Sequence, residues 1–242
     1  MTQILQAGIH AIPAHITYFP EMDQGSEDWL AARCGMLTAS EVKLIMTATG
    51  KVADNDKTRA HVYELAAQRL TGFVEPRFIS DDMLRGHEDE VEARIAYEKA
   101  YGGTATMGFI VNRRWGFPIG YSPDWLVGSD GLAESKSRAQ RFQVQTIAEC
   151  VTADTIPTDF MLQCQTGLLV SERKWLDFCS YSNGMPMAVI RVLPDAAIQE
   201  AIIAAATAFE AKIAAVMQDY RGALESGARL IPTERRIIQE MF

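Results

Sequence analysis

The chain has 242 residues, of which 48% are hydrophobic, and a formal net charge of −8 at pH 7. This length and composition suit one sizeable core, and a single domain covering residues 1–242 is the simplest organisation. No apolar run approaches the length of a membrane span, and the first residues lack the pattern of a secretion signal, so we expect a soluble, cytoplasmic protein with no membrane partner.

The cysteine pattern excludes a zinc or iron–sulfur centre of the usual kind. The four cysteines, at positions 34, 150, 164 and 179, show no metal-ligand spacing and are scattered over apolar segments. Such scatter is typical of reduced, mostly buried thiols in a cytosolic protein.

The first part of the chain predicts an extended segment, 1–24, followed by helices at about 26–33, 38–47 and 57–70. Thr38 and Glu41 have the spacing of a capping box, which predicts a helix start at Thr38. Ser40 would then lie in the first turn, where unpaired backbone N–H groups favour an anion, and Arg33 lies just upstream. The alternative is an ordinary capping serine and a surface arginine.

The polar stretch 47–56 predicts a loop that contains Lys51. A helix with many acidic residues is predicted next, at about 83–97. Its acids either form a solvated face or include an oxygen donor for a metal ion.

Two strand-like segments in the middle of the chain carry the main chemical signal. Asp124 follows the apolar segment 117–121, and Glu134 and Lys136 lie two residues apart on the segment 132–136. Because side chains alternate along a strand, Glu134 and Lys136 point to one face. Two carboxylates and an ammonium group suit a Mg²⁺-dependent nuclease, although a surface hairpin has the same local pattern.

The rest of the chain predicts a helix at 158–171, with Thr158 as its cap. Two strands are expected at 175–181 and 187–193, on either side of a Ser-Asn-Gly turn. A helix at 195–220 and a tail at 224–242 complete the chain. Gln163 and Gln165 cannot share one helix face, because neighbours on a helix recur at three and four positions.

Five ordered blocks between about Trp29 and Tyr181 together carry a family resemblance. These blocks are Trp29-x-x-x-Arg33-x-Gly35-x-x-Thr38-Ala39-Ser40-Glu41, Arg85-Gly-x-x-x-Glu90, Ser122-Pro123-Asp124, Glu134-x-Lys136 and Gln163-x-Gln165. The set resembles lambda exonuclease and the YqaJ-type phage recombination nucleases of the PD-(D/E)xK superfamily. The resemblance implies an α/β fold, with a central mixed sheet flanked by helices and helical additions at both ends.

The resemblance also implies catalytic roles for residues of these blocks. Carboxylates of Glu90, Asp124 and Glu134, with the backbone carbonyl of Ser135, would hold one or two Mg²⁺ ions. Mn²⁺ could substitute, because all of these ligands are oxygens. Lys136 would position and activate the attacking water, and Gln163 would contact the scissile phosphate or that water, whereas Gln165 is expected to be structural.

A pocket for the 5′-phosphate end of the cut strand is a further implication of the resemblance. The matching residues are Arg33, Ser40 and Ser122, and either Arg138 or Arg141 could complete the pocket. In addition, the loop with Lys51 matches a segment that touches the incoming duplex, and Met83 matches an apolar wedge that separates the terminal base pairs.

By the same resemblance, we expect a phage- or prophage-encoded 5′-to-3′ exonuclease that degrades one strand of linear double-stranded DNA to mononucleotides. The remaining 3′ single strand would pass to a phage-type single-strand annealing protein. A ring-shaped homotrimer with a basic inner channel and an acidic exterior would reconcile DNA binding with the net charge of −8.

Three alternatives stay open at the level of sequence. An endonuclease of the structure-selective or restriction type would keep the metal ligands but need no DNA end. A non-catalytic subunit that binds DNA ends would keep a decayed nuclease fold, and a plain α/β domain would carry the motifs by coincidence.

Overall fold

The computed structural model describes residues 13–47, 49–76 and 81–235, and of residues 81–83 it describes the backbone alone. The strands are β1 (Ile16–Phe19), β2 (Leu37–Thr38), β3 (Thr104–Ala105), β4 (Phe109–Asn112), β5 (Ile119–Tyr121), β6 (Trp125–Val127), β7 (Gly131–Ser137), β8 (Trp175–Tyr181) and β9 (Ala188–Val192). The helices are α2 (Glu27–Arg33), η1 (Ala39–Glu41), α3 (Val42–Ile45), α4 (Asp56–Thr71), α5 (Asp81–Tyr101), α6 (Gln140–Gln145), η2 (Thr146–Val151), α7 (Thr158–Ser171) and α8 (Ala196–Glu225).

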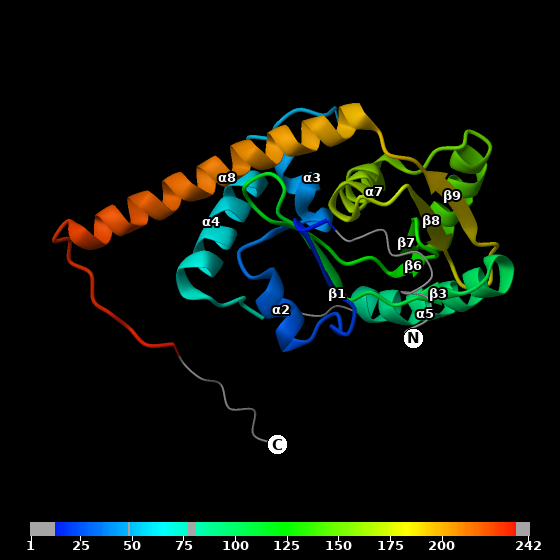
Figure 1. Cartoon of the computed structure of the whole chain (residues 1–242), viewed down its shortest axis with the longest axis horizontal. Coiled ribbons are helices and arrows are strands. Elements are labelled where there is room, and N and C mark those ends of the chain that lie inside the picture. The colour runs from blue at the N-terminus through cyan, green and yellow to red at the C-terminus, as the bar shows by residue number, and fades with distance from the viewer. Residues whose placement is uncertain (1–12, 48, 77–80, 236–242) are drawn as a thin grey trace, which may run out of the picture.

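The strands form two sheets of mixed direction (Figure 1). The first has the order β1-β4-β5-β2 and contains the parallel pair β2 and β5. The second has the order β3-β6-β7-β8-β9 and contains the parallel pair β7 and β8. The chain passes from the first sheet to the second between Tyr121 at the end of β5 and Trp125 at the start of β6, so Asp124 lies at the junction of the sheets.

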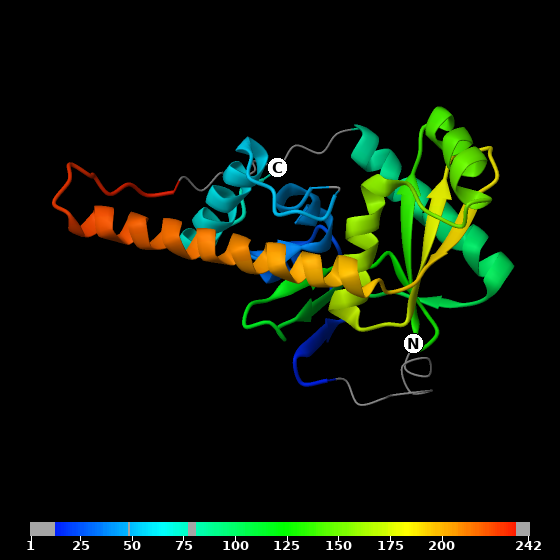
Figure 2. The ribbon, with the colours of Figure 1, turned by 90° about the horizontal axis from the view of Figure 1, so that it is seen from above.

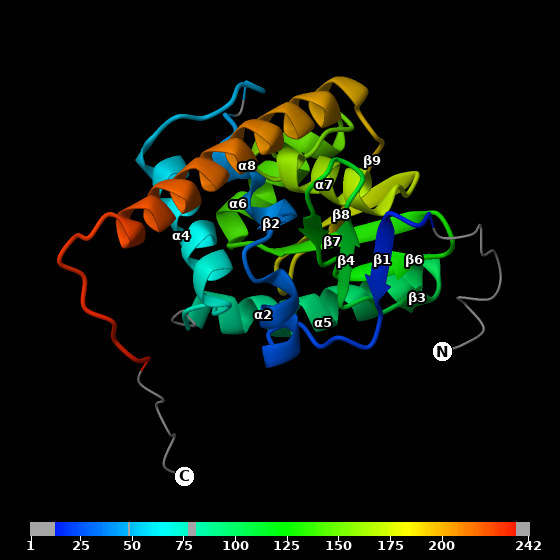
Figure 3. The same cartoon turned by 60° about the vertical axis from the view of Figure 1, so that its left-hand side comes forward.

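Helices pack on both sheets and hold them together (Figures 1 and 3). Helix α7 contacts β4 and β5 of the first sheet and β8 of the second, whereas α5 contacts β7 and β8. Helix α8 packs on α3, α4 and α7, and its C-terminal half extends away from the sheets (Figure 2). No helix in the described ranges is both long and apolar enough to cross a bilayer.

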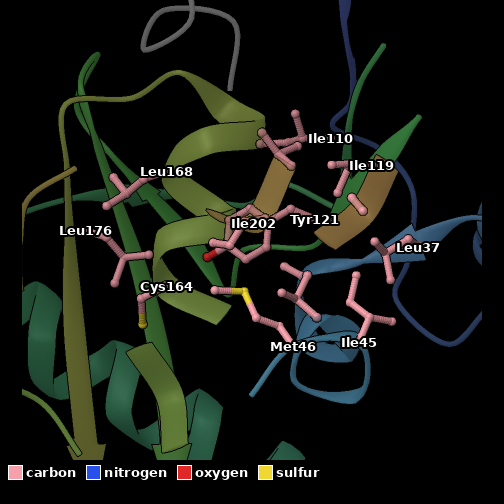
Figure 4. Packing of buried hydrophobic residues seen from close by; sticks show 14 of the residues in the cluster. Leu37, Ile45, Met46, Ile110, Ile119, Tyr121, Cys164, Leu168, Leu176 and Ile202 are labelled. Carbon is pink, nitrogen blue, oxygen red and sulfur yellow. The ribbon is translucent and has the colours of Figure 1, made fainter. Parts of the chain in front are cut away.

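The largest hydrophobic cluster joins both sheets to α3, α4, α7 and α8 (Figure 4). A second cluster lies between α5 and the second sheet and contains Ala93, Tyr97, Trp125, Ala133 and Cys179. Burying a large apolar side chain contributes about 1.5–3 kcal/mol, so this second cluster fixes β6 and β7 firmly against α5. Strand β6, which directly follows Asp124, and strand β7, which carries Glu134, therefore have rigid support.

The predicted α/β class, with mixed sheets flanked by helices, is confirmed, although the strands form two sheets rather than a single central one. The predicted helix 158–171 and strand 175–181 have the observed bounds. All four cysteines are free thiols, as expected.

Several local predictions are wrong. The helix expected at 38–47 is instead strand β2, the 3-10 helix η1 and the short helix α3, although the Thr38–Glu41 capping box does form. Pro157 occupies the N-cap of α7, and no side chain caps that end, so Thr158 is not the cap. The tail expected from Leu224 begins later, because α8 continues to Glu225. Predictions for residues 1–12 and 236–242 lie outside the described residues.

Candidate active site

The side chain of Asp124 is joined to the backbone of β7 by a hydrogen bond. The antiparallel register of β6 and β7 pairs Trp125 with Ala133, which brings the residue before β6 alongside the next residues of β7. Asp124 Oδ2 accepts a 2.5 Å hydrogen bond from the backbone N–H of Ser135. The carboxylate is thereby fixed beside the Glu134-Ser135-Lys136 segment.

Glu134 is the centre of the site. Its side chain is only 2% exposed. Glu134 Oε1 accepts hydrogen bonds of 2.5 Å from Lys136 Nζ and 2.5 Å from Gln163 Nε2. Glu134 Oε2 accepts a 2.9 Å hydrogen bond from the Tyr121 hydroxyl. Three donors from β5, β7 and α7 therefore stabilise one buried carboxylate.

Alternation along β7 gives its two faces different functions. Leu132 belongs to the large core beneath α7, and Glu134 and Lys136 follow on the same face. Ala133 packs toward α5 on the opposite face, where the Ser137 hydroxyl donates a 2.5 Å hydrogen bond to Asp89. The predicted convergence of Glu134 and Lys136 on one face is confirmed by their direct ion pair.

The site concentrates negative charge. Burial raises the pKa of Asp124 well above its ordinary value, and the carboxylates of Glu134 and Glu90 raise it further. The pKa of Glu90 is also raised, chiefly by burial, with Glu134 acting in the same direction and His87 against it. Burial lowers the pKa of Lys136, but Glu134 and Asp124 raise it more, so this side chain is held as an ammonium ion.

The donor chemistry suits a hard divalent cation. Asp124 and Glu134 offer carboxylate oxygens, and Glu90 lies close enough to affect the same charges. Within the described ranges, no three acidic, histidine or cysteine side chains are grouped tightly enough to form a ready-made metal centre. The pKa values of Asp124 and Glu90 are raised by burial and by repulsion between carboxylates, and a bound cation would offset both effects. Mg²⁺ commonly completes its shell with water and substrate phosphate oxygens.

The residues predicted for the 5′-phosphate pocket are linked to one another. The Arg33 guanidinium lies 3.9 Å from the centre of the Trp29 ring, and Trp29 Nε1 donates a 2.9 Å hydrogen bond to Ser122 Oγ. Arg33 also donates a 3.1 Å hydrogen bond to Thr38 Oγ1. Helix α2 is thus connected to both β2 and the turn that carries Asp124.

Ser40 joins the same group through Thr38, because their hydroxyl oxygens are 3.4 Å apart. Its side chain is exposed, as an anion ligand should be. The structure therefore brings Arg33, Ser40 and Ser122 into one neighbourhood, and Ser122 lies two residues from Asp124 along the chain.

Of the two candidate arginines, Arg138 contacts an aromatic ring that Lys136 also approaches. Its guanidinium is 5.0 Å from the Phe160 ring, and Lys136 Nζ is 5.8 Å from the same ring. Both guanidinium groups lie over the Phe142 ring, that of Arg138 at 5.0 Å and that of the exposed Arg141 at 4.6 Å. Arg138 Nε is buried and has no hydrogen-bond partner among the described residues.

Three further predicted residues lie apart from this site or outside its description. Lys51 is exposed in the loop between α3 and α4, and its backbone N–H bonds to the Thr47 hydroxyl. Met83 lies in α5, but its side chain is outside the described part of the structure. Gln165 is structural as predicted, because it bonds to the backbone of Leu193 and Asp195 before α8.

Sequence reasoning missed the parts played by Tyr121, Trp29 and Thr38. Each acts through a contact with a distant segment, which no local pattern predicts. The available signal was position, since Tyr121 directly precedes Ser122-Pro123-Asp124 and the other two belong to the first motif block.

Comparisons with known proteins agree with the fold described above. The sequence model of one protein family, the YqaJ-like viral recombinase domain, matches residues 28–174. The chain is similar to the alkaline exonuclease LHK-Exo from Laribacter hongkongensis, with 30% identity, coverage of 84% of this chain and 100% of that chain, and a TM-score of 0.72. The structure of LHK-Exo in complex with dAMP gives the same identity and coverage and a TM-score of 0.73.

A phage related exonuclease from Haemophilus somnus 129PT shares 13% identity over 76% of this chain and 96% of that chain, with a TM-score of 0.56, which is a likeness of fold alone. None of the curated proteins compared with the chain matches it significantly.

Proposed function

Because the chain belongs to the family of YqaJ-like viral recombinase domains, we propose that it is a phage-type exonuclease acting on linear double-stranded DNA. It degrades one strand in the 5′-to-3′ direction in the presence of Mg²⁺, releases mononucleotides and leaves 3′ single-stranded DNA. LHK-Exo, an alkaline exonuclease whose structure was solved with a deoxynucleoside monophosphate, supports this proposal.

The single observation that carries the proposal is the convergence of Asp124, Glu134, Lys136 and Gln163. These residues come from the β5–β6 turn, β7 and α7. Lys136 and Gln163 each donate a 2.5 Å hydrogen bond to Glu134, and Asp124 accepts one from the backbone N–H of the next residue of β7, Ser135. A buried acid with an adjacent ammonium ion is costly to maintain for stability alone, and such groups gather at functional sites.

Each residue of this group has a distinct role in the proposed reaction. Bound Mg²⁺ would polarise the scissile phosphate and make water a better nucleophile. Glu90, Asp124 and Glu134 would hold the ion with the Ser135 carbonyl. The Lys136 ammonium places positive charge beside the phosphate and orients the attacking water. Without a bound cation, the carboxylates of Glu134 and Asp124 raise the pKa of Lys136 and hold its side chain as an ammonium ion.

Gln163 connects α7 to the reacting groups. Its Nε2 donates to Glu134, and its Oε1 accepts no hydrogen bond from the described residues. That carbonyl oxygen is therefore available to orient the attacking water.

Recognition of the DNA end follows from the group formed by Arg33, Ser40 and Ser122. A guanidinium and two hydroxyls offer the donors that a terminal phosphate needs, and Arg suits bidentate contact with phosphate oxygens. The Trp29 ring stacks on Arg33 and holds its guanidinium in place. Arg138, on the Lys136 side, supplies a further positive charge.

The net charge of −8 makes indiscriminate DNA binding unfavourable, so the proposal includes assembly of copies of the chain into a ring with a basic inner surface. A homotrimer is the form we propose, with a single-strand annealing protein as the recipient of the 3′ strand.

Digestion of a linear duplex with Mg²⁺ tests the proposal. The substrates are duplexes with 5′-phosphate or 5′-hydroxyl ends and closed circles, and Lys136→Ala serves as the inactive variant. We expect mononucleotides from linear DNA only, faster from the phosphorylated end, and at least about 10²-fold less product with the variant.

Other outcomes separate the competing activities. Cleavage of closed circles would indicate an endonuclease on the same fold. Binding of DNA ends without metal-dependent cleavage would indicate a non-catalytic subunit.

A further inference from the structure

Tyr121 is a buried side chain with no part in the mechanism above. It ends β5, is 1% exposed, and is packed among core residues of both sheets (Figure 4). Its hydroxyl makes a polar contact within these apolar surroundings, because it donates a 2.9 Å hydrogen bond to Glu134 Oε2.

The Tyr121 ring has little freedom to move. Gly167 of α7 lies directly against it, because a Cβ atom at position 167 would come within 2.7 Å of the ring. A residue other than glycine would therefore displace either the helix or the ring. Close packing against the backbone of α7 thus fixes the Tyr121 ring in the position where its hydroxyl bonds to Glu134.

The lone pairs of Glu134 show what this contact does. A carboxylate has about four lone-pair sites, two on each oxygen. Oε1 uses both of its sites, for Lys136 and Gln163. Oε2 uses one, for Tyr121. A single site on Oε2 is left, and Asp124 Oδ1 likewise accepts no hydrogen bond from the described residues.

We infer that Tyr121 is a positioning residue, which holds the Glu134 carboxylate so that one lone pair of Oε2 is available to a divalent cation. This inference rests on the proposed function and adds a residue that sets the cation affinity of the site. Tyr121 acts through Glu134 and does not touch the DNA or the cation.

Removal of the hydroxyl leaves Glu134 held through Oε1 alone, so the carboxylate can rotate and present Oε2 in more than one direction. Loss of a hydrogen bond to a metal ligand commonly weakens metal binding about 10–100-fold. We expect Tyr121→Phe to raise the Mg²⁺ concentration for half-maximal cleavage by at least about 10-fold, with a much smaller change in the rate at saturating Mg²⁺.

Two measurements on the full chain test the inference. One is the rise in melting temperature as Mg²⁺ is added without DNA, and the other is the Mg²⁺ dependence of linear-duplex digestion. Tyr18→Phe is the matched control, because its hydroxyl donates to the backbone carbonyl of Ser171, at 3.2 Å, away from Glu134. Gly167→Ala is a second variant, which keeps the Tyr121 hydroxyl but forces the Tyr121 ring and helix α7 apart.

The expected result is a weaker Mg²⁺ response of Tyr121→Phe and Gly167→Ala in both measurements, with Tyr18→Phe like the wild type. Equal Mg²⁺ midpoints for Tyr121→Phe and Tyr18→Phe would overturn the inference. A wild-type chain that neither cleaves DNA nor responds to Mg²⁺ would instead overturn the proposed function. If Tyr121→Phe does not fold, the Mg²⁺ midpoint of Gly167→Ala tests the inference instead. A midpoint of Gly167→Ala equal to that of the wild type would then overturn the inference.

Discussion

The backbone N–H of Ser135 donates a 2.5 Å hydrogen bond to the carboxylate of Asp124. Asp124 lies in the turn between the two sheets and Ser135 in the middle of β7, so this bond joins the sheet junction to the strand that carries Glu134 and Lys136. The fold of the chain therefore holds the carboxylates of Asp124 and Glu134 close together in spite of their mutual repulsion.

Replacement of Asp124 by Asn should separate stability from activity. The amide oxygen can still accept the Ser135 hydrogen bond, while the repulsion with Glu134 and Glu90 disappears. We expect an unchanged or higher melting temperature without metal, and cleavage reduced by at least about 10²-fold. Melting curves without metal and digestion rates with Mg²⁺ measure the two effects, and cleavage near the wild-type rate would contradict the assigned role.

Replacement of Ser122 by Ala should reduce the preference for phosphorylated ends. A hydrogen bond to a charged group contributes about 1.5–3 kcal/mol, so we expect the ratio of kcat/KM for 5′-phosphate over 5′-hydroxyl duplexes to fall about 10-fold or more. Ser226→Ala, at the exposed end of α8, is the control. A wild-type ratio in Ser122→Ala would remove this serine from the pocket.

Tyr97→Phe should affect stability without affecting catalysis. The Tyr97 hydroxyl donates a 2.6 Å hydrogen bond to Asp177, a carboxylate only 3% exposed that also pairs with Arg191. We expect the free energy of unfolding to fall by about 1.5–3 kcal/mol, as for a hydrogen bond to a charged group. Urea denaturation measures the loss, with the half-exposed Tyr63→Phe as control. A large loss of activity per folded molecule would show that Tyr97 does more than support α5.

Glu172 should make the fold sensitive to acid. Although burial raises it, the pKa of Glu172 is lowered overall by hydrogen bonds from His15, Asn112 and Arg114 and by the charge of His15. A carboxyl group with a lowered folded-state pKa stabilises the fold above its ordinary pKa of about 4.3, and this contribution is lost as the pH falls through the folded-state value.

We therefore expect the melting temperature of Glu172→Gln to fall less than that of the wild type when the pH is lowered from about 6 to about 3. Gln keeps the size of the side chain at this left-handed position, where φ is 54°. Parallel pH curves for the two proteins would show that Glu172 contributes nothing to acid unfolding.

Long elements with a clear pattern were predictable from the sequence, and short ones were not. The helix 158–171 has enough turns to show its apolar positions, and strands β8 and β9 flank a strong turn signal. Strands β3, β4 and β6 have two to four residues, too few to show alternation. The break of the 38–47 segment into β2, η1 and α3 depends on pairing of β2 with the distant strand β5, which overrides the local preference for helix.

The site shows the same division between local and distant information. Strand alternation was enough to predict that Glu134 and Lys136 share a face, and the ordered blocks pointed to Gln163. The contact of Arg138 with Phe160 of α7 favours it over Arg141, and the contact of Tyr121 with Glu134 depends on how β5 packs beneath the same helix. Both depend on tertiary packing, about which the local sequence carries no signal.

The polarity of digestion tests the central claim most directly. A linear duplex with phosphorylated 5′ ends carries one label at the 5′ end of a strand and a different label at the 3′ end of the same strand, and products are sampled over time with Mg²⁺. We predict that the 5′ label appears first, as a mononucleotide, while the 3′ label stays in a shortening strand and the complementary 3′ overhang persists. Early release of the 3′ label as a mononucleotide, or internal fragments carrying both strands, would contradict the assignment as a 5′-to-3′ exonuclease.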